Sequence, residues 1–343
     1  MQFTRPGPGS TILLMLPAGL AIGSTPAVAH VKWFAPYDVA SQPERLGHVV
    51  SPLFLELFLL ALLTLWVACA VERTWLGRTV QGALDAVFHD LRLRSDTLIR
   101  AGVAAFCIAI WVFGGVILTP ELKTSVAATG WLQVAIAICT LWSSTVALAG
   151  LGVVVLFVQG VWTYGVFHMM DYPIFLGAAA YLMMTGLGLE SVLGVRPLTV
   201  VRWGAAVTLM WASVEKWAYP AWSHPLLATH PSITCGFSPG FYMAAAGIVE
   251  FSLSFALLWT PLIRRIAAIV LGSMFLGAVF EFGKLDAIGH LLIIVLLVVI
   301  AADDTPTRRC SLPLVPAWFS AALAVTVAAY YFGHALLFHT GIV

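Results

Sequence analysis

The sequence predicts an all-α protein, a polytopic transmembrane helical bundle of about ten spans. Only 10% of the 343 residues are charged and 61% are hydrophobic, whereas soluble domains carry about 25% charged residues. The apolar residues also gather in stretches near the length of about 20 residues that an α-helix needs to cross a bilayer. We therefore expect a multi-pass membrane protein with no soluble domain.

The first 29 residues predict a cleavable signal peptide. Arg5 provides a basic start, residues 11–22 form a short apolar core, and Ala27-Val28-Ala29 is a small-x-small cleavage site. Cleavage would leave His30 as the first residue, and its free amine and imidazole could together bind copper(II). If the leader is retained, that amine is absent and the copper hypothesis loses its best ligand.

Ten apolar segments follow the leader. We expect spans at about residues 51–71, 101–118, 125–146, 149–168, 172–192, 203–219, 240–260, 266–282, 287–302 and 314–336. Residues 72–100, between the first two spans, are rich in arginine and alternate apolar with charged side chains. That pattern predicts an amphipathic helix on the cytoplasmic membrane surface.

The number of spans depends on residues 124–170, which contain no charged side chain. They form either one long helix or two spans joined near Gly150 and Gly152. Three later loops carry paired arginines, namely Arg196 with Arg202, Arg264 with Arg265, and Arg308 with Arg309. All three are cytoplasmic by the positive-inside rule only if residues 124–170 cross twice. Ten spans follow, and nine, which would invert everything after the third, is the alternative.

Residues 201–302 carry short spaced motifs. Arg202 opens a helix that ends with Trp-Ala-Ser-Val-Glu-Lys at 211–216, Glu250 lies in the next, Arg264 starts the third, and His290 begins the fourth. This pattern resembles DoxX-type four-helix membrane proteins. The resemblance implies a DoxX-like unit at 201–302, after an amino-terminal bundle of about five spans at 30–200 and before a final span and periplasmic tail at 303–343.

The chain departs from that family by its longer loop at 220–240 and its five additional amino-terminal spans. One branch of the family is associated with quinone-linked oxidation of thiosulfate. The motifs quoted above do not carry that chemistry over to this chain.

Glu215, Lys216 and Glu250 are ionisable residues inside predicted spans. A charge in hydrocarbon costs about 3 kcal/mol or more unless it is paired or hydrated. Glu215 and Lys216 are sequence neighbours and point about 100° apart on a helix, so Lys216 is better placed to pair with Glu250 on the next helix. The pair either fixes helix packing or belongs to a proton or quinone site, where a buried carboxylate could relay a proton.

Four ionisable residues cluster near the eighth and ninth spans. Glu281 with Lys284, and Asp286 with His290, would share helix faces. We expect residues 283–288 to form a turn at the outer interface, where hydration explains the charges. The alternative is a cluster that faces the loop containing His224.

Several histidines and methionines suggest copper. The candidate ligands are His30, His168, Met169, Met170, His224 and His230. Thioethers favour copper(I) and imidazole binds copper well, but methionine is also a common apolar filler. The ten-span topology places all six on the periplasmic face, and their spacing matches no zinc signature.

Motifs for ATP binding, serine hydrolysis, zinc proteolysis, c-type haem and nucleic-acid binding are absent from the sequence. The first hypothesis is an accessory protein or subunit of a periplasm-facing redox or quinone-linked system in a bacterial inner membrane, with the lipid bilayer and other redox subunits as partners. The second is a copper transporter or delivery protein. The third is a structural or assembly component. Whether any cofactor binds, and whether the chain is an enzyme, stays open.

Overall fold

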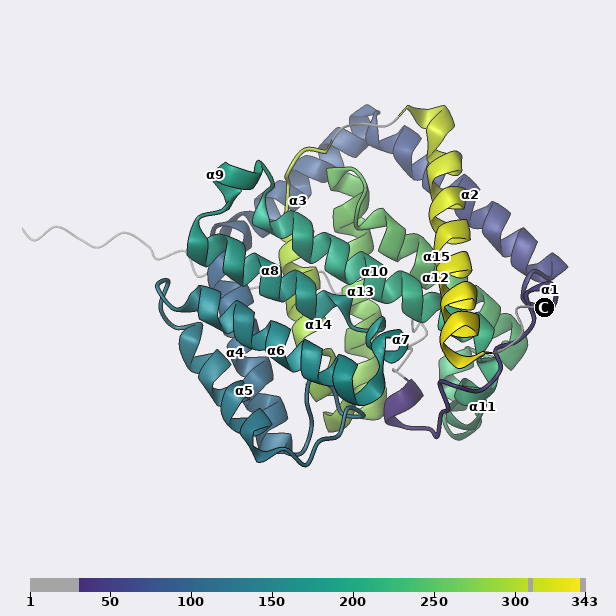
Figure 1. The fold of residues 1–343 in the computed structure, drawn as a ribbon. Helices are drawn as coiled ribbons and strands as arrows, with labels where there is room; N and C mark the ends of the chain where they lie inside the picture. Colours follow the sequence, from purple (N-terminus) through teal and green to yellow (C-terminus); the bar gives the residue numbers. More distant parts are fainter. Residues whose placement is uncertain (1–30, 308–310, 340–343) are drawn as a thin grey trace, which may run out of the picture.

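The computed structural model describes residues 31–307 and 311–339, and Figure 1 shows them as a bundle of helices. The longer helices are α2 (Pro52–Glu72), α3 (Trp75–Leu93), α4 (Ser95–Phe113), α5 (Ala127–Cys139), α6 (Val146–Tyr164), α8 (Pro173–Leu187), α10 (Pro197–Ala218), α11 (Pro220–Thr229), α12 (Pro239–Ala256), α13 (Pro261–Phe282), α14 (Lys284–Ala302) and α15 (Val315–Phe338). The shorter ones are α1 (Leu46–Val49), α7 (Val166–Met169), α9 (Glu190–Leu193) and the 3-10 helices η1 (Val31–Trp33), η2 (Pro231–Thr234) and η3 (Leu312–Leu314). The described residues contain no β-strand, which confirms the all-α prediction.

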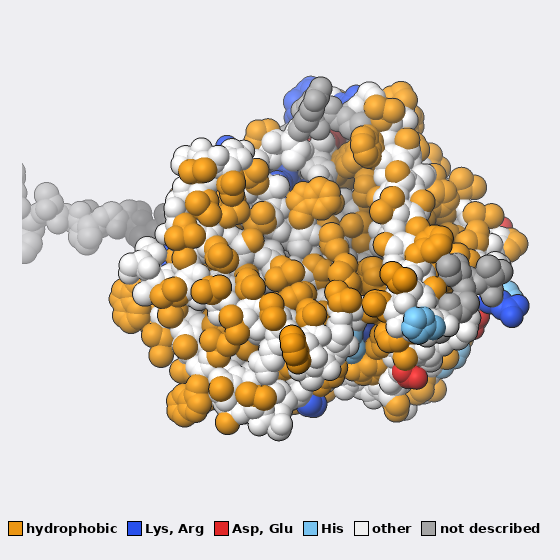
Figure 2. Space-filling view, in the orientation of Figure 1, with side chains coloured by type: hydrophobic (Ala, Val, Ile, Leu, Met, Phe, Trp, Pro, Cys, Tyr) orange, Lys and Arg blue, Asp and Glu red, His pale blue; other side chains and the backbone are white. Residues whose placement is uncertain are grey.

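Six of the described helices are long and apolar enough to cross a membrane: α2, α4, α6, α13, α14 and the segment that includes α15. α5 and α8 are apolar but shorter. Apolar side chains spread across the face seen in Figure 2, where lysine and arginine lie near the edges. These features confirm a multi-pass membrane protein.

Ten helices make up most of the bundle: α2, α4, α5, α6, α8, α10, α12, α13, α14 and α15. Residue contacts show that successive helices are antiparallel, for example α5 with α6, α6 with α8 and α8 with α10. The bundle therefore has two ends. We call one the arginine end, where Arg202, Arg264, Arg265, Asp85 and Asp303 meet. We call the other the cavity end, where Lys32, Asp171, Glu215, Lys216 and Glu250 lie. α10 joins them, since Arg202 and Glu215 are 13 residues apart and about 20 Å along a helix axis.

The uncharged segment 124–170 forms two helices, α5 and α6. The turn between them lies at residues 140–145, where Thr145 donates to the carbonyl of Cys139 and Arg100 to that of Thr140. The expected turn near Gly150 and Gly152 is wrong, because both lie inside α6. A Cβ at Gly150 would lie 2.6 Å from the carbonyl oxygen of Ala179, so this glycine lets α6 pack closely on α8.

Other boundaries also differ from the prediction, and two of them bear on the loops. The second span was expected at 101–118, but α4 ends at Phe113 because Gly114 and Gly115 adopt φ of 79° and 64°. Residues 114–126 then fold back as a loop. The expected loop at 220–240 contains α11 and η2 instead, and prolines at the first position of each suit helix starts.

The arginine end is a buried ion-pair network. Arg264 and Arg265, expected in a loop, lie in the first turn of α13 and are fully buried. Arg264 pairs with Asp303 at 2.7 Å and Arg265 with Asp85 of α3 at 2.6 Å. Arg202 of α10 also reaches Asp303, at 3.2 Å. Because buried charges need partners, these pairs hold α3, α10, α13 and the end of α14 together.

Candidate functional site

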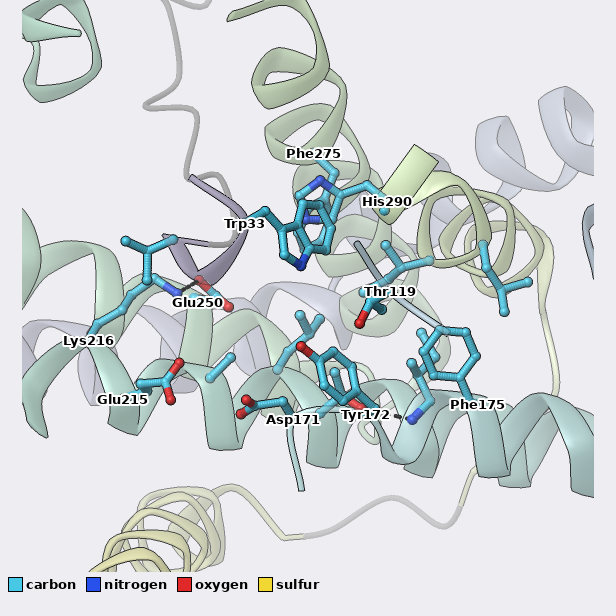
Figure 3. A pocket seen from close by; sticks show the side chains of 18 of the residues that line it. Trp33, Thr119, Asp171, Tyr172, Phe175, Glu215, Lys216, Glu250, Phe275 and His290 are labelled. Atoms are coloured by element: carbon cyan, nitrogen blue, oxygen red, sulfur yellow. Dashed lines mark hydrogen bonds and ion pairs between the residues drawn. The ribbon is translucent and has the colours of Figure 1, made fainter. Parts of the chain in front are cut away.

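A cavity of about 100 Å³ lies at the cavity end, between α8, α10, α12, α13, α14 and η1. That space is large enough for several water molecules. Its wall combines aromatic side chains, among them Trp33, Tyr172, Phe175, Tyr219, Trp222 and Phe275, with the ionisable side chains of Asp171, Glu215, Lys216, Glu250 and His290 (Figure 3). The three ionisable residues singled out from the sequence, Glu215, Lys216 and Glu250, therefore face one space.

Lys216 and Glu250 form the ion pair expected between neighbouring helices. Lys216 Nζ lies 2.7 Å from Glu250 Oε2, with both side chains largely buried. α10 and α12 approach closely because residue 247 is glycine, where a Cβ would lie 2.2 Å from Trp217 Nε1. The predicted contact is confirmed, and its chemical role stays a prediction.

Glu215 has a different partner, which the sequence analysis missed. Lys32 Nζ lies 2.6 Å from Glu215 Oε1 and 2.5 Å from Asp171 Oδ2. Burial lowers the pKa of Lys32, but the Asp171 and Glu215 carboxylates raise it more, so the ammonium stays charged. The available signal was a lone lysine in the otherwise apolar run 31–34.

Lys32 enters the site on the chain's own amino-terminal segment. We call residues 31–38 the amino-terminal arm. Trp33 of the arm lies against Gly289, where a Cβ would be 2.0 Å from the indole ring, and its ring centroid is 4.6 Å from that of His290. Figure 3 shows Trp33 beside His290 at one side of the cavity. The arm therefore forms part of the wall.

Asp286 and His290 overturn the expectation of a hydrated turn. α13 ends at Phe282, Gly283 turns the chain at φ 73°, and α14 starts at once with Lys284. Both Asp286 and His290 are consequently buried in α14, where His290 Nδ1 lies 2.8 Å from Asp286 Oδ2.

The other half of that charged cluster lies at the surface. Glu281 accepts from His230 Nδ1 at 3.0 Å and from Ser232 at 3.2 Å, so it faces the segment after α11. Lys284 is exposed. The alternative of a cluster facing the His224 loop therefore holds for Glu281 and not for Asp286 or His290.

A second buried carboxyl lies near the arm. Glu121 belongs to the loop between α4 and α5, and burial raises its pKa to about 7. Its charge interacts with His168 and Lys32. His168 is buried between aromatic side chains, with ring centroids 5.6 Å from Tyr37 and 5.4 Å from Tyr164.

The candidate copper ligands do not converge. Met169 is fully buried against Gly160, and His168 beside it lies among aromatic rings. His224 is exposed on α11, His230 pairs with Glu281, and Met170 is half-buried. His30 lies outside the described residues. Within the described ranges, no three histidine, cysteine, aspartate or glutamate side chains are grouped as a metal site.

The arrangement suits proton exchange and the binding of a small polar group. The wall of the cavity holds three carboxylates, Asp171, Glu215 and Glu250, and one lysine, Lys216. Lys32 pairs with Asp171 and Glu215 from beside the wall. An excess carboxylate in a buried site favours uptake of a proton or a cation. In comparisons with known proteins, no protein-family model, no curated protein and no solved structure matches this chain.

Proposed function

We propose that this protein crosses a bacterial inner membrane ten times, with the arginine end in the cytoplasm and the cavity end in the periplasm. The antiparallel contacts between successive helices, such as α5 with α6 and α8 with α10, support this topology. So does the clustering of Arg92, Arg196, Arg202, Arg264 and Arg265 at one end, because cytoplasmic segments carry the excess of arginine.

The topology can be tested with a native cysteine. Cys235 is exposed, lies just after η2, and would be periplasmic. We expect a membrane-impermeant maleimide to label intact cells or spheroplasts at Cys235, and Cys235→Ser to abolish that label. Buried Cys107 is the internal control, since it should react only after denaturation. Labelling of Cys235 only in inverted vesicles would reverse the proposed orientation.

We further propose that the cavity binds the headgroup of a quinone, and that the protein serves as an accessory subunit of a quinone-linked redox system. The observation that carries this proposal is the pairing of flat aromatic walls with two buried acid–base pairs. Lys216 of α10 pairs with Glu250 of α12, whereas Asp286 and His290 both lie on α14. Each pair has a member in the wall of the cavity.

The chemistry of a quinone fits these groups. A quinone ring offers two carbonyl oxygens, which need hydrogen-bond donors, and lysine and histidine can both donate. Glu250 and His290 could exchange protons with a bound headgroup. The volume of about 100 Å³ admits one small ring and leaves any isoprenoid tail outside. The DoxX resemblance of residues 201–302 does not carry quinone chemistry over to this chain, so the proposal rests on the cavity alone.

The test is quinone binding by purified protein. A short-tailed ubiquinone analogue should quench tryptophan fluorescence saturably, because Trp33 and Trp222 line the cavity. We expect Glu250→Gln to weaken binding about tenfold or more, since a lost hydrogen bond to a charged group costs about 1.5–3 kcal/mol. Glu56→Gln is the matched control, because Glu56 also lies in an apolar helix but is exposed.

Two results would count against the quinone proposal. Absence of saturable quenching in the wild type would remove it. Equal binding by Glu250→Gln, at normal protein level, would remove Glu250 from the site. Reduced stability of the charge variants with unchanged quinone binding would favour a structural or assembly role.

A further inference from the structure

The Nζ atom of Lys32 lies in a cage of acidic and aromatic groups. Asp171 Oδ2 and Glu215 Oε1 are 2.5 and 2.6 Å away. The ring centroids of Tyr37 and Trp222 are each 5.5 Å from Nζ. We call these four side chains the ammonium cage. Carboxylates bind an ammonium ion by charge-assisted hydrogen bonds, and ring faces attract it within about 6 Å.

The occupant of the cage belongs to the amino-terminal arm, which contains no long helix. The amino-terminal arm is tied to the bundle from Val39 onward, where His334 contacts the Val39 carbonyl and Tyr219 donates to that of Ser41. Upstream of Val39, in the described residues, Lys32 forms ion pairs with the bundle. Trp33 and Phe34 also contact rings of the bundle. Withdrawal of the arm would therefore break no long helix.

The space and charge beside the cage suit a second ammonium-bearing molecule. Asp171, Glu215 and Trp222 belong both to the cage and to the wall of the cavity. Asp171 Oδ1 is buried and accepts no hydrogen bond from the residues that the structure describes. Even with Lys32 counted beside the wall, the three carboxylates of the wall outnumber the two lysines, so a cationic ligand is favoured over an anionic one.

We propose that the ammonium cage is a binding subsite for primary alkylammonium ions, and that Lys32 is its tethered, exchangeable occupant. A ligand places its ammonium between Asp171 and Glu215 and its alkyl chain in the adjoining cavity. This inference goes beyond quinone binding and does not need it, because the cage contacts are those of Lys32 itself.

Tethering sets the concentration at which a free amine competes. A group on a short flexible segment acts at an effective concentration on the order of millimolar. The wild type should therefore respond to a free amine only at high concentration. Removal of the lysine side chain by Lys32→Ala should expose the subsite and lower the half-saturating concentration by about tenfold or more.

The experiment measures thermal unfolding of the purified protein against n-propylammonium chloride. For Lys32→Ala we expect a saturable rise in the unfolding midpoint. Neutral 1-propanol should not produce it, and neither should tetramethylammonium, which has no N–H donor. Sodium chloride at equal concentration controls for ionic strength.

Two lysine variants serve as controls. In Lys32→Met, the methionine side chain fills the space of the lysine alkyl chain without its charge. Propylammonium should therefore have no effect on this variant. Lys123→Ala removes an exposed lysine and should respond like the wild type. A similar response in Lys32→Met, or an equal response to tetramethylammonium, would overturn the proposal.

A second variant covers the case in which Lys32→Ala does not fold. Lys32→Ala/Asp171→Asn carries one carboxylate fewer in the cage, so it needs less compensation for the missing ammonium. We expect propylammonium to stabilise it through Glu215, with a higher half-saturating concentration than for the single variant. No saturable response in either variant would overturn the proposal, whatever the outcome of the quinone measurements.

Discussion

The two ends of the bundle both bury charged side chains, but they differ in what surrounds them. At the arginine end, Arg264 and Arg265 donate to the carboxylates of Asp303 and Asp85 and also to backbone carbonyls. At the cavity end, Lys32 and Lys216 meet carboxylates beside an open space lined with aromatic rings. The first arrangement joins helices, and the second leaves room for a ligand.

The choice of cation explains part of this difference. The planar guanidinium group of arginine spreads several donors in a fixed fork, which suits permanent links between two or three chain segments. The ammonium group of lysine is a compact charge on a flexible stem, which a ligand's ammonium or a proton acceptor can replace or approach. The type of buried cation therefore separates the structural end from the candidate site.

The strongest test of the comparison is removal of Asp303. Asp303→Ala leaves Arg202 and Arg264 buried without their shared carboxylate, so we expect a loss of about 3–5 kcal/mol in the free energy of unfolding. Denaturant unfolding in detergent measures it. Asp304→Ala is the control, because its pair with Arg92 is partly exposed and should be worth at most about 1 kcal/mol. Equal effects would show that the network does not hold the helices.

A double-mutant cycle at the cavity end should give a smaller effect. Lys216→Met and Glu250→Gln each leave one charged partner poorly compensated, at a cost of about 2–4 kcal/mol. The double variant should cost less than the sum of the two, with a coupling energy of about 1–3 kcal/mol. Unfolding of the four proteins gives the coupling. Simple additivity would show that the pair contributes nothing, even though the atoms lie 2.7 Å apart.

Glu121 should make stability depend on pH. Its pKa is raised from 4.5 to about 7 in the folded protein, so between these values the folded state binds more protons than the unfolded state. Stability should therefore fall as pH rises through that range, and the penalty is complete above pH about 7. Glu121→Gln should recover about 1–3 kcal/mol at pH 8 relative to pH 5.

The matched variant for Glu121 is Glu44→Gln, since the Glu44 side chain is half exposed. It should leave the pH profile unchanged. A Glu121→Gln profile that parallels the wild type would mean that Glu121 ionises normally in the folded protein.

The smallest expected effect is at Gly289. A methyl group there would overlap the indole of Trp33, and because the arm can move away, Gly289→Ala should cost only about 1 kcal/mol. Faster hydrogen exchange in residues 31–38 should reveal the displaced arm. Gly272→Ala is the control, since its nearest neighbour is 4.0 Å away. Unchanged exchange in Gly289→Ala would show that Trp33 is not held by this contact.

Much of the fold follows from the sequence, because composition and apolar stretches specify membrane helices directly. The Lys216–Glu250 contact was also predictable, since two opposite charges on adjacent apolar helices have few other partners. The helix break at 140–145 was not predictable from the apolar pattern. It is stabilised by polar side chains, since Arg100 and Thr145 donate hydrogen bonds to backbone carbonyls there. Glycines in α6 resemble turn signals in sequence but serve close packing.

The remaining parts of the site depend on contacts between distant segments. Lys32 and Asp171 are 139 residues apart, and a single sequence gives no signal for such a pair. Asp286 and His290 have helical spacing, but their burial depends on where α14 begins. Because α14 starts directly after Gly283, both residues lie within the helix and are buried. The copper hypothesis gains no support, because neighbours in sequence need not share a site. His168 lies beside Tyr37, whereas Met169 packs against Gly160.

The short helix α5 has a consequence for the surrounding lipid. Its 13 residues extend about 20 Å, whereas the hydrocarbon layer is about 30 Å thick. Trp131 near its start and Trp142 just beyond its end are both exposed, and indole rings settle at headgroup depth. On the topology proposed above, the bilayer should be locally thinned beside α5. Thinner membranes should therefore accommodate the protein with less deformation.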